Sequence, residues 1–265
     1  MQRLDAQLSP QRVLSAMARR IANLPHTLAW AFSDQARDNR QALAAFAGLH
    51  RGQRAFIMGN GPSLGRMDLG PLADEVTFGM NRIYLLFEQM VFQPSYYVSI
   101  NDLVLGQFAH EIAQLPMPNF LNWTQRHAFP EDETILYLRP RLALRDGFQG
   151  DVRQPIYSGG TVTYAALQLA YYLGFDEVIL IGVDHRFAAQ GTPNQAETRA
   201  GADRDHFHPD YFPAGSRWQL PDLRRSELAY QLADEGFRAA GRRVLDATVD
   251  GACPVFEKVD FEGLF

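Results

Sequence analysis

The sequence predicts a doubly wound, mainly parallel, Rossmann-like α/β sheet with helices on both faces, an N-terminal helical extension and a long lid loop. Three observations support this fold class: short apolar runs recur along the chain, helical stretches separate them, and several runs are apolar almost throughout. Strands that helices cover on both faces have this uninterrupted apolar character, and strands that alternate with helices form parallel sheets.

The chain has 265 residues, of which 46% are hydrophobic, enough for one main domain with a substantial core. The pattern is helical over the first 50 residues, and we expect Pro25 to end one helix before a second runs to about Ala47. We therefore assign residues 1–50 to a helical extension and residues 51–265 to the main α/β domain.

Six apolar runs of the main domain are expected to be strands, at residues 54–59, 75–80, 96–100, 135–138, 177–182 and 242–248. Helices are expected between them at residues 102–115, 160–173 and 222–240. The stretch from about 186 to 221 is rich in glycine, proline, charged and aromatic residues. Compact domains seldom contain a structureless loop of more than ~15 residues unless it binds a ligand or covers a site, so we expect a lid here.

Charge and cysteine content exclude several classes of protein. The formal net charge is -5, which offers no basic surface for wrapping nucleic acid. The single cysteine, Cys253, excludes an internal disulfide framework and a cysteine-based zinc cluster, and it fits the cytoplasm. No run approaches the ~18 apolar residues that span a bilayer. The basic, amphipathic segment 9–24 could contact the inner face of a membrane peripherally, although packing on its own protein is the simpler explanation.

The stretch Gly59-Asn60-Gly61-Pro62-Ser63 follows the first expected strand, at the sheet edge where open α/β proteins bind ligands. The glycines can take positive φ and let a ligand reach the backbone, and Asn60 and Ser63 offer hydrogen-bonding side chains. A nucleotide is the natural ligand. A tight turn that binds no ligand explains the glycines equally well.

Known nucleotide-binding loops match this turn poorly. It lacks the Gly-Lys-Ser/Thr of a P-loop, and the third glycine of a dinucleotide fingerprint would fall at Leu64. Asn81 stands where a nicotinamide-binding protein presents an acid. Asn60, Asn81 and Asn101 each follow one of the first three strands, so their amides could converge on a base and a ribose; ordinary capping of turns and helices is the alternative.

A second anion-binding element is expected at the start of the next helix. Ser158 can cap this helix, and Gly159 and Gly160 would expose backbone N–H groups in its first turn, where phosphate binds readily. Beyond the following strand, Asp184 could hold a ribose, a metal or a loop N–H. Arg186 could pair with a phosphate or a carboxylate.

Two lid histidines, His206 and His208, stand beside Asp205 and Asp210. Histidines two residues apart could share a metal ion, but no further ligand has diagnostic spacing, so we predict no metal site. A neutral imidazole oriented by an aspartate could instead act as a general base. Surface histidines without a catalytic task are the remaining interpretation.

Several segments carry a resemblance to a known group of proteins: GNGPSL, FGMNRIYLLF, SIND and YSGGTVTYAALQLAYYLGFDEVILIGVDH, followed by the histidine segment. The chain resembles MptE-like bacterial proteins, named for an archaeal 6-hydroxymethylpterin pyrophosphokinase. It is more distantly similar to the single-domain bacterial sialyltransferases and to the flagellin-modifying motility accessory factors. The likeness runs from about residue 54 to residue 247.

The resemblance to the sialyltransferases implies a parallel α/β sheet and a sugar transfer that requires no metal. It implies that the cytidine nucleotide is held by Asn60, Gly61, Ser63, Asn81 and Asn101, and that Ser158 and Gly159 approach the donor. His208 is the nearest match to the catalytic base of that family, and His206 is the second. Those enzymes stabilise the departing phosphate with tyrosines, whereas this chain has Arg186.

We therefore expect a nucleotide-sugar glycosyltransferase, inverting, with a CMP-activated acidic sugar donor, a glycan or small-molecule acceptor and no required cofactor. Its role would lie in surface glycan or glycoconjugate synthesis. One alternative is diphosphoryl transfer from ATP to a pterin alcohol, with Mg²⁺ held by Asp102 or Asp184. Another is a nucleotide-binding protein without catalysis. The resemblance leaves a homo-oligomer open.

Overall fold

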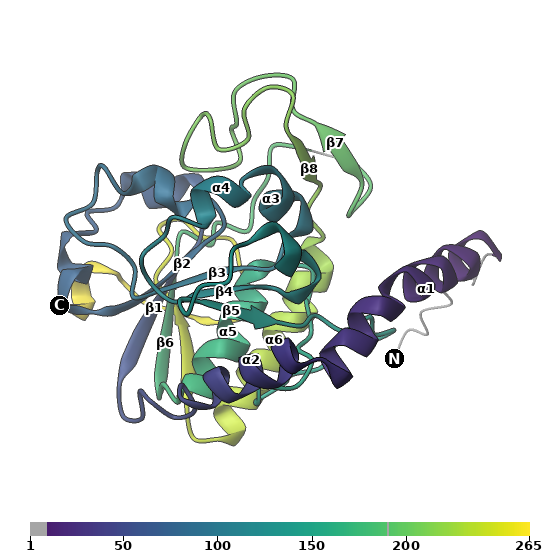
Figure 1. Cartoon of the computed structure of the whole chain (residues 1–265). Helices are drawn as coiled ribbons and strands as arrows, with labels where there is room; N and C mark the ends of the chain where they lie inside the picture. The colour runs from purple at the N-terminus through teal and green to yellow at the C-terminus, as the bar shows by residue number, and fades with distance from the viewer. Residues whose placement is uncertain (1–9, 190) are drawn as a thin grey trace, which may run out of the picture.

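The computed structural model describes residues 10–189 and 191–265, in which eight parallel strands form one sheet (Figure 1). Their spatial order is β10 (Glu257–Lys258), β9 (Arg243–Asp246), β6 (Glu177–Ile181), β1 (Arg54–Met58), β2 (Val76–Met80), β3 (Tyr96–Ser99), β4 (Asn119–Asn122) and β5 (Ile135–Leu138). Strands β2 to β5 extend from one side of β1, and β6, β9 and β10 extend from the other. This doubly wound parallel sheet confirms the predicted fold class.

Helices cover both faces of the sheet, and each face has its own hydrophobic cluster. On one face, α5 and α6 pack with Leu43 of α2; on the other, α3, α4 and the 3-10 helices pack with Trp30 of α1. The α-helices are α1 (Pro10–Phe32), α2 (Asp34–Ala44), α3 (Asp102–Gln107), α4 (Ala109–Ile112), α5 (Val162–Leu173) and α6 (Leu223–Ala239). The 3-10 helices are η1 (Pro62–Arg66), η2 (Gly70–Asp74), η3 (Ile83–Leu86), η4 (Trp123–Ala128) and η5 (Glu262–Leu264). Within the described ranges, no helix is both long enough and apolar enough to cross a bilayer.

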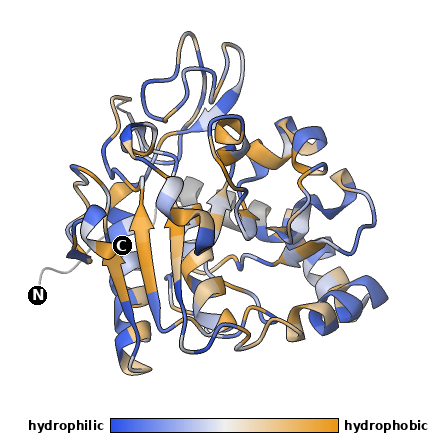
Figure 2. Cartoon of the chain, turned by 90° about the vertical axis from the view of Figure 1, so that its left-hand side faces the viewer, coloured by the Kyte–Doolittle hydropathy of each residue, from blue (hydrophilic) through white to orange (hydrophobic). Residues whose placement is uncertain are grey.

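All six expected strands are present, as β1, β2, β3, β5, β6 and β9. Figure 2 shows the central strands coloured as hydrophobic along most of their length, and β1, β2 and β6 are buried at every position except the first. Strand β4 was not predicted. Its sequence, Asn-Phe-Leu-Asn, is half polar, yet all four residues are buried.

Helix α1 continues through Pro25 to Phe32, so the prediction that Pro25 ends this helix is wrong. A proline in a helix interior costs about 3 kcal/mol, which tertiary packing can offset. Trp30 is buried and stacks edge-on against Trp123 of η4, with ring centroids 5.2 Å apart. The chain turns instead at Ser33, whose hydroxyl caps the first turn of α2.

Helix α2 protects the free edge of β5. Asn39 Nδ2 donates to the carbonyl oxygen of Tyr137 at 2.9 Å, and the Tyr137 N–H donates to Asn39 Oδ1 at 2.7 Å. The amide thereby bonds this edge residue as a neighbouring strand would, which blocks pairing with another chain.

The expected lid, from about residue 186 to 221, folds over the carboxyl edge of the sheet and contains the antiparallel strands β7 (Ala196–Thr198) and β8 (Arg217–Gln219) (Figure 1). Tyr211 and Trp218 bury their side chains in the cluster below. The Arg82 guanidinium donates to the carbonyl oxygens of Asp210, at 2.8 Å, and Tyr211. The segment is therefore docked on the domain by buried contacts.

Candidate functional site

The glycine turn after β1 is pressed against the end of β6. The Gly59 N–H donates to Ile181 O at 2.7 Å, and the Gly61 N–H donates to Gly182 O at 2.9 Å. A Cβ added at Gly59 would lie 2.1 Å from Gly182 O, and one at Gly61 would lie 1.9 Å from Asp184 Oδ2. Only residues without a side chain allow the two loops to run in contact.

The reason expected for these glycines, a positive φ, is wrong. Gly61 has a φ of -70°, and Gly59 also lies outside the positive-φ region. A backbone of this kind accepts any residue, so the close approach of the β6 loop alone requires glycine here.

Asp184 and Ser63 join the two loops. The Ser63 N–H donates to Asp184 Oδ1 at 3.1 Å, and the Ser63 hydroxyl donates to Oδ2 at 2.6 Å. Ser63 is fully buried, so its hydroxyl has no free face for a ligand. Three partners were considered for Asp184: a ribose, a metal or a loop N–H. The structure shows a loop N–H, that of Ser63.

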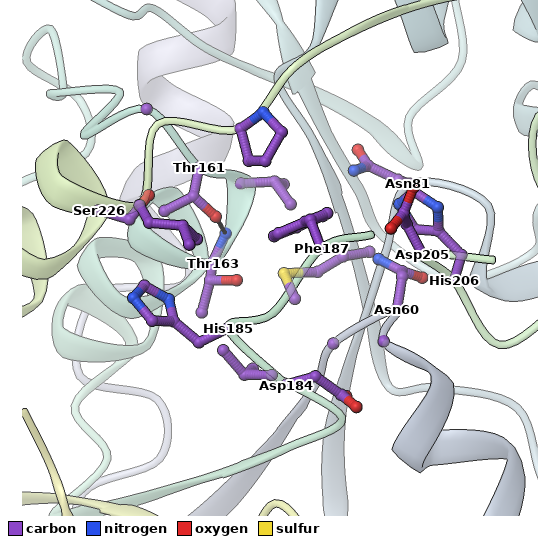
Figure 3. A pocket seen from close by; sticks show the side chains of 18 of the residues that line it. Asn60, Asn81, Thr161, Thr163, Asp184, His185, Phe187, Asp205, His206 and Ser226 are labelled. Atoms are coloured by element: carbon purple, nitrogen blue, oxygen red, sulfur yellow. Dashed lines mark hydrogen bonds between the residues drawn. The ribbon is translucent and has the colours of Figure 1, made fainter. Parts of the chain in front are cut away.

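A pocket of about 210 Å³ opens above this turn, where the strand order reverses between β1 and β6. Open α/β sheets bind their ligands at such a point. Nine of the predicted site residues line it: Gly59, Asn60, Gly61, Asn81, Asn101, Gly160, Asp184, Arg186 and His206. The other four, Ser63, Ser158, Gly159 and His208, are not among its lining residues. Figure 3 shows Asn81 and His206 on one side of the pocket and Thr161, Thr163 and His185 on the other.

The three strand-end asparagines all line the pocket, and two of them also perform structural tasks. Asn81 Oδ1 accepts from the Ser99 hydroxyl at 3.0 Å, and Asn101 Oδ1 caps α3 by accepting from the Leu103 N–H at 2.9 Å. In both residues Nδ2 has no partner in the described chain and remains a free donor. Asn60 Oδ1 is buried and unpartnered among the described residues. The Asn60 Nδ2 likewise has no partner in the described chain, so the pocket offers three amide donors, and the buried Asn60 Oδ1 becomes an acceptor for a ligand only if that amide turns.

The prediction that Ser158 caps α5 is wrong, because the helix begins after the two glycines. Thr161 is the cap: its Oγ1 accepts from the N–H two residues on, at 3.3 Å. Gly159 and Gly160 have φ values of +54° and +78°, a left-handed conformation that an α-helix does not contain. The Ser158 hydroxyl instead accepts from Arg225 at 3.2 Å.

The start of α5 still presents backbone donors to the pocket. Gly160 and Val162 line it, and their N–H groups have no hydrogen-bond partner among the described residues. They lie at the positive end of the α5 dipole, where an anionic group is favoured.

His206 is held by a buried carboxylate. Its Nδ1 lies 2.9 Å from Asp203 Oδ2, and the Asp203 side chain is fully buried. The imidazole also stacks flat on Tyr211, with centroids 4.0 Å apart and an interplanar angle of 2°. Because Asp203 holds Nδ1–H, the second nitrogen, Nε2, is left to act as an acceptor.

Asp203 stays ionised in this arrangement. Burial by itself would raise its pKa, but hydrogen bonds from His206 and from the Asp205 N–H, with the charges of His206 and Arg199, hold the pKa below its ordinary value. Arg199 Nη2 lies 3.1 Å from Asp203 Oδ1. Asp203 thus carries the orienting role that sequence reasoning gave to the neighbours of the histidines.

His208 lies away from the pocket lining. Its Nδ1 accepts from the Asp210 N–H at 3.1 Å, and its carbonyl oxygen accepts from the Tyr211 N–H at 3.0 Å. These contacts make a local turn, and the neighbouring aspartate reaches His208 only through its backbone. The order of the two histidines as candidate bases is therefore reversed by their placement.

A second histidine of the pocket, His185, was missed as a site residue. Its side chain is 6% exposed, and its Nε2 lies 3.0 Å from Glu227 Oε1 on α6. The φ of +55° at His185 is unusual for a residue with a side chain and marks this loop as constrained. The only sequence signal for His185 was its position directly after Asp184. No sequence pattern shows its contact with Glu227, 42 residues later. Arg186, next in the chain, is exposed, lines the pocket and forms no ion pair with a described residue.

The two carboxylates considered for Mg²⁺ both accept hydrogen bonds from the protein, Asp102 through Oδ1 alone. Asp102 Oδ1 accepts hydrogen bonds from the side chains of Asn122, Thr124 and Gln125 at 2.8–3.0 Å. Asp184 uses both oxygens for Ser63. Among the described residues, no group of three or more histidines, cysteines and acids is placed to hold a metal ion.

Comparisons with known proteins identify a family and a similar solved structure. A family model described as 6-hydroxymethylpterin diphosphokinase MptE-like matches residues 31–190. The solved structure of a MAf glycosyltransferase from Magnetospirillum magneticum AMB-1 is similar at a TM-score of 0.50 and 15% identity, over 84% of this chain and 38% of that one. This chain thus spans well under half of that protein, and at such an identity the likeness supports the fold alone. A search of curated proteins finds no match.

The family assignment rests on the sequence match, which includes β1, β6 and the strand-end asparagines between them. Because the family model matches more than half of the chain, this protein belongs to the MptE-like family.

Proposed function

We propose that this chain is an inverting, nucleotide-sugar-dependent glycosyltransferase that uses a CMP-activated acidic sugar in surface glycan or glycoconjugate synthesis. The observation that carries the proposal is the Asp203–His206 pair, an oriented imidazole in a pocket whose lining also includes three strand-end asparagines at the reversal point of the sheet. An imidazole held by a carboxylate on one nitrogen is suited to remove a proton with the other.

The nucleotide would occupy the strand ends. The Nδ2 groups of Asn60, Asn81 and Asn101 can donate to acceptors of a base and a ribose, and Asn60 Oδ1 can accept from a base once its amide turns into the pocket. The phosphate would lie against the free N–H groups of Gly160 and Val162, with Arg186 beside it. No lysine lines the pocket, and one phosphate matches this limited positive charge better than a chain of three.

In the transfer, His206 Nε2 takes the proton of the acceptor hydroxyl while the hydroxyl oxygen attacks the anomeric carbon. The bond from that carbon to the phosphate oxygen breaks, and its electron pair leaves with CMP. Arg186 and the α5 N–H groups stabilise the charge that develops on the phosphate. Asp203 remains ionised and stabilises the imidazolium. General-base catalysis of this kind contributes roughly 10²–10⁴-fold to the rate.

Diphosphoryl transfer from ATP, the activity in the printed family description, is the second candidate. Such transfer uses magnesium ions to bridge the phosphates and neutralise charge. The candidate carboxylates, Asp102 and Asp184, already accept hydrogen bonds from the protein, which favours the glycosyltransferase. A nucleotide-binding protein without catalysis is the third.

The test combines a ligand panel with two matched variants. Thermal stabilisation by CMP or CDP without metal supports the transferase, whereas stabilisation only by ATP with Mg²⁺ supports the kinase, and stabilisation without any turnover supports a binding protein. Products are identified by mass spectrometry. His206→Ala should lower transfer by about 10²–10⁴-fold while CMP still stabilises the variant. His208→Ala, two residues away, is the control and should retain activity. A fully active His206→Ala variant would contradict the assignment of the base.

A further inference from the structure

Helix α1 carries an apolar stripe that the rest of the chain does not cover. Ile21, Leu24, Leu28 and Phe32 are 68%, 51%, 49% and 82% exposed. Figure 1 shows α1 projecting away from the sheet domain. We name these four residues the α1 stripe. Sequence reasoning preferred to pack Ile21 and Leu24 on the protein itself, and the structure places both outside.

A different face of α1 attaches the helix to the domain. His26 and Trp30 face η4: the Trp123 Nε1–H donates to His26 O at 3.0 Å, and His26 Nδ1 lies 3.0 Å from Arg126 Nη1. At 100° per residue, the α1 stripe lies opposite this attached face. The α1 stripe therefore takes no part in packing the helix on the domain.

The spacing of the α1 stripe suits a flat surface. Its members are separated by three, four and four residues, so three helical turns cover eleven residues and the stripe runs nearly straight along the axis. The stripe extends about 16 Å at a rise of 1.5 Å per residue.

The charge of α1 has the sign that an anionic surface attracts. Residues 10–32 contain three arginines and no aspartate or glutamate, although the whole chain has a net charge of -5. Arg20 is exposed one residue before the α1 stripe begins. The first acidic residues after this segment, Asp34 and Asp38, both lie within ion-pair distance of Arg37.

A loop with the same character leaves the sheet beside α1. Arg139, directly after β5, donates from Nη2 to Thr27 Oγ1 of α1 at 2.7 Å. The loop then exposes Leu142 and Leu144, at 48% and 84%, and includes Arg145, which forms no ion pair with a described residue. Exposed leucines near an exposed arginine therefore occur both on α1 and on this loop beside it.

We propose that the α1 stripe docks on an anionic phospholipid surface, with the helix axis in the plane of the membrane and Arg20 toward the headgroups. An apolar face with basic residues at its border binds such surfaces through buried apolar area and electrostatic attraction. A second copy of the chain is a poorer occupant, because pairing two α1 helices would bring their positive charges together. The proposal does not depend on the proposed transferase activity.

The experiment is co-sedimentation of the full chain with vesicles. With equal parts phosphatidylglycerol and phosphatidylcholine the protein should pellet, and with phosphatidylcholine alone it should bind much less. Ile21→Ser/Leu28→Ser should weaken binding at least about tenfold, because two exposed apolar side chains no longer enter the interface. Arg20→Gln should weaken it roughly fivefold, the effect of one basic residue near such a membrane. Val91→Ser, at a residue 82% exposed and outside the α1 stripe, is the control and should bind as the wild type does.

Three results would overturn the proposal. The wild-type chain could stay in the supernatant with anionic vesicles. Val91→Ser could lose as much binding as the double variant, which would make the attraction nonspecific. Sedimentation equilibrium could show a dimer that Ile21→Ser/Leu28→Ser abolishes, without vesicle binding, which would make a second copy the occupant. Since all substituted residues are exposed, circular dichroism should show each variant folded.

Discussion

Gly61→Ala tests whether contact between two loops, rather than backbone conformation, requires glycine beneath the pocket. The backbone at Gly61, with φ -70° and ψ 161°, accepts alanine without strain. The new Cβ would lie 1.9 Å from Asp184 Oδ2 and 2.5 Å from its Cγ, so the carboxylate must move. That movement breaks the hydrogen bonds from the Ser63 N–H and hydroxyl.

The expected loss follows from these two bonds. Each is a hydrogen bond to a charged group and contributes about 1.5–3 kcal/mol, which gives a loss of about 3–6 kcal/mol. Replacing glycine by alanine also stiffens the unfolded chain, which returns about 0.4–1 kcal/mol. A net loss near 4 kcal/mol would lower the Tm of a domain of this size by roughly 10 °C.

Urea unfolding followed by circular dichroism measures this loss, and the same turn provides the control. A Cβ at Gly65 would meet nothing closer than 3.6 Å, so Gly65→Ala should be neutral or slightly stabilising. In an Asp184→Gly background the obstruction is removed, because the Asp184 Cβ, 2.9 Å from the new Cβ, is also gone, and Gly61→Ala should then cost little. The explanation fails if Gly61→Ala is as stable as Gly65→Ala, or if its cost persists without Asp184.

Three further outcomes are expected. Arg82→Lys should lower stability by about 1.5–3 kcal/mol and speed proteolysis of the lid, since lysine lacks both the Nε donor to the Tyr84 hydroxyl and the planar guanidinium that lies on Phe108. Urea unfolding and limited trypsin digestion measure the two effects. The pKa of Asp203 is lower in the folded chain than the unfolded value of about 3.9. The stabilisation by its carboxylate is therefore present above the unfolded value and is lost as the pH falls through the folded value. Asp203→Asn should have a lower free energy of unfolding in urea than wild type at neutral pH, and the difference should disappear on acidification. Asn60→Ala should weaken CMP binding about tenfold in calorimetry with little loss of Tm, because Oδ1 has no partner among the described residues.

The sheet was predictable wherever burial on both faces left an apolar run, and β4 shows where that signal fails. Asn119 and Asn122 occupy half of this strand and are 1% and 4% exposed. Asn119 Nδ2 donates to the carbonyl oxygens of Leu115 and Met117, and Asn122 Nδ2 donates to Ile100 O. A buried amide nitrogen that donates to backbone carbonyls costs little, although Asn119 Oδ1 has no partner among the described residues, and the carbonyl partners are in reach only in the folded chain.

The location of the candidate site was also predictable from the strands. Which histidine is the candidate base was not. Parallel strands bring their carboxyl ends to one edge, so Asn60, Asn81 and Asn101 had to approach one another whatever their side chains do. The choice between His206 and His208 depends on how the lid folds. That fold turns His206 onto the buried Asp203, three residues earlier, and leaves His208 in a local turn.

The residues that build the floor of the pocket also determine what the pocket can bind. Gly59 and Gly61 hold the turn against β6 by backbone hydrogen bonds, and the lid closes it from above, because the Phe207 N–H donates to Asn60 O at 3.0 Å. With both neighbours and its own carbonyl fixed, Asn60 has only its side chain left to adjust, and Oδ1 is buried without a partner among the described residues. An unpaired buried acceptor lowers the stability of the folded chain. If the Asn60 amide turns so that Oδ1 accepts from a ligand N–H, that cost is removed. A cytosine amino group has that chemistry, whereas a base that offers only acceptors there would leave the cost in place.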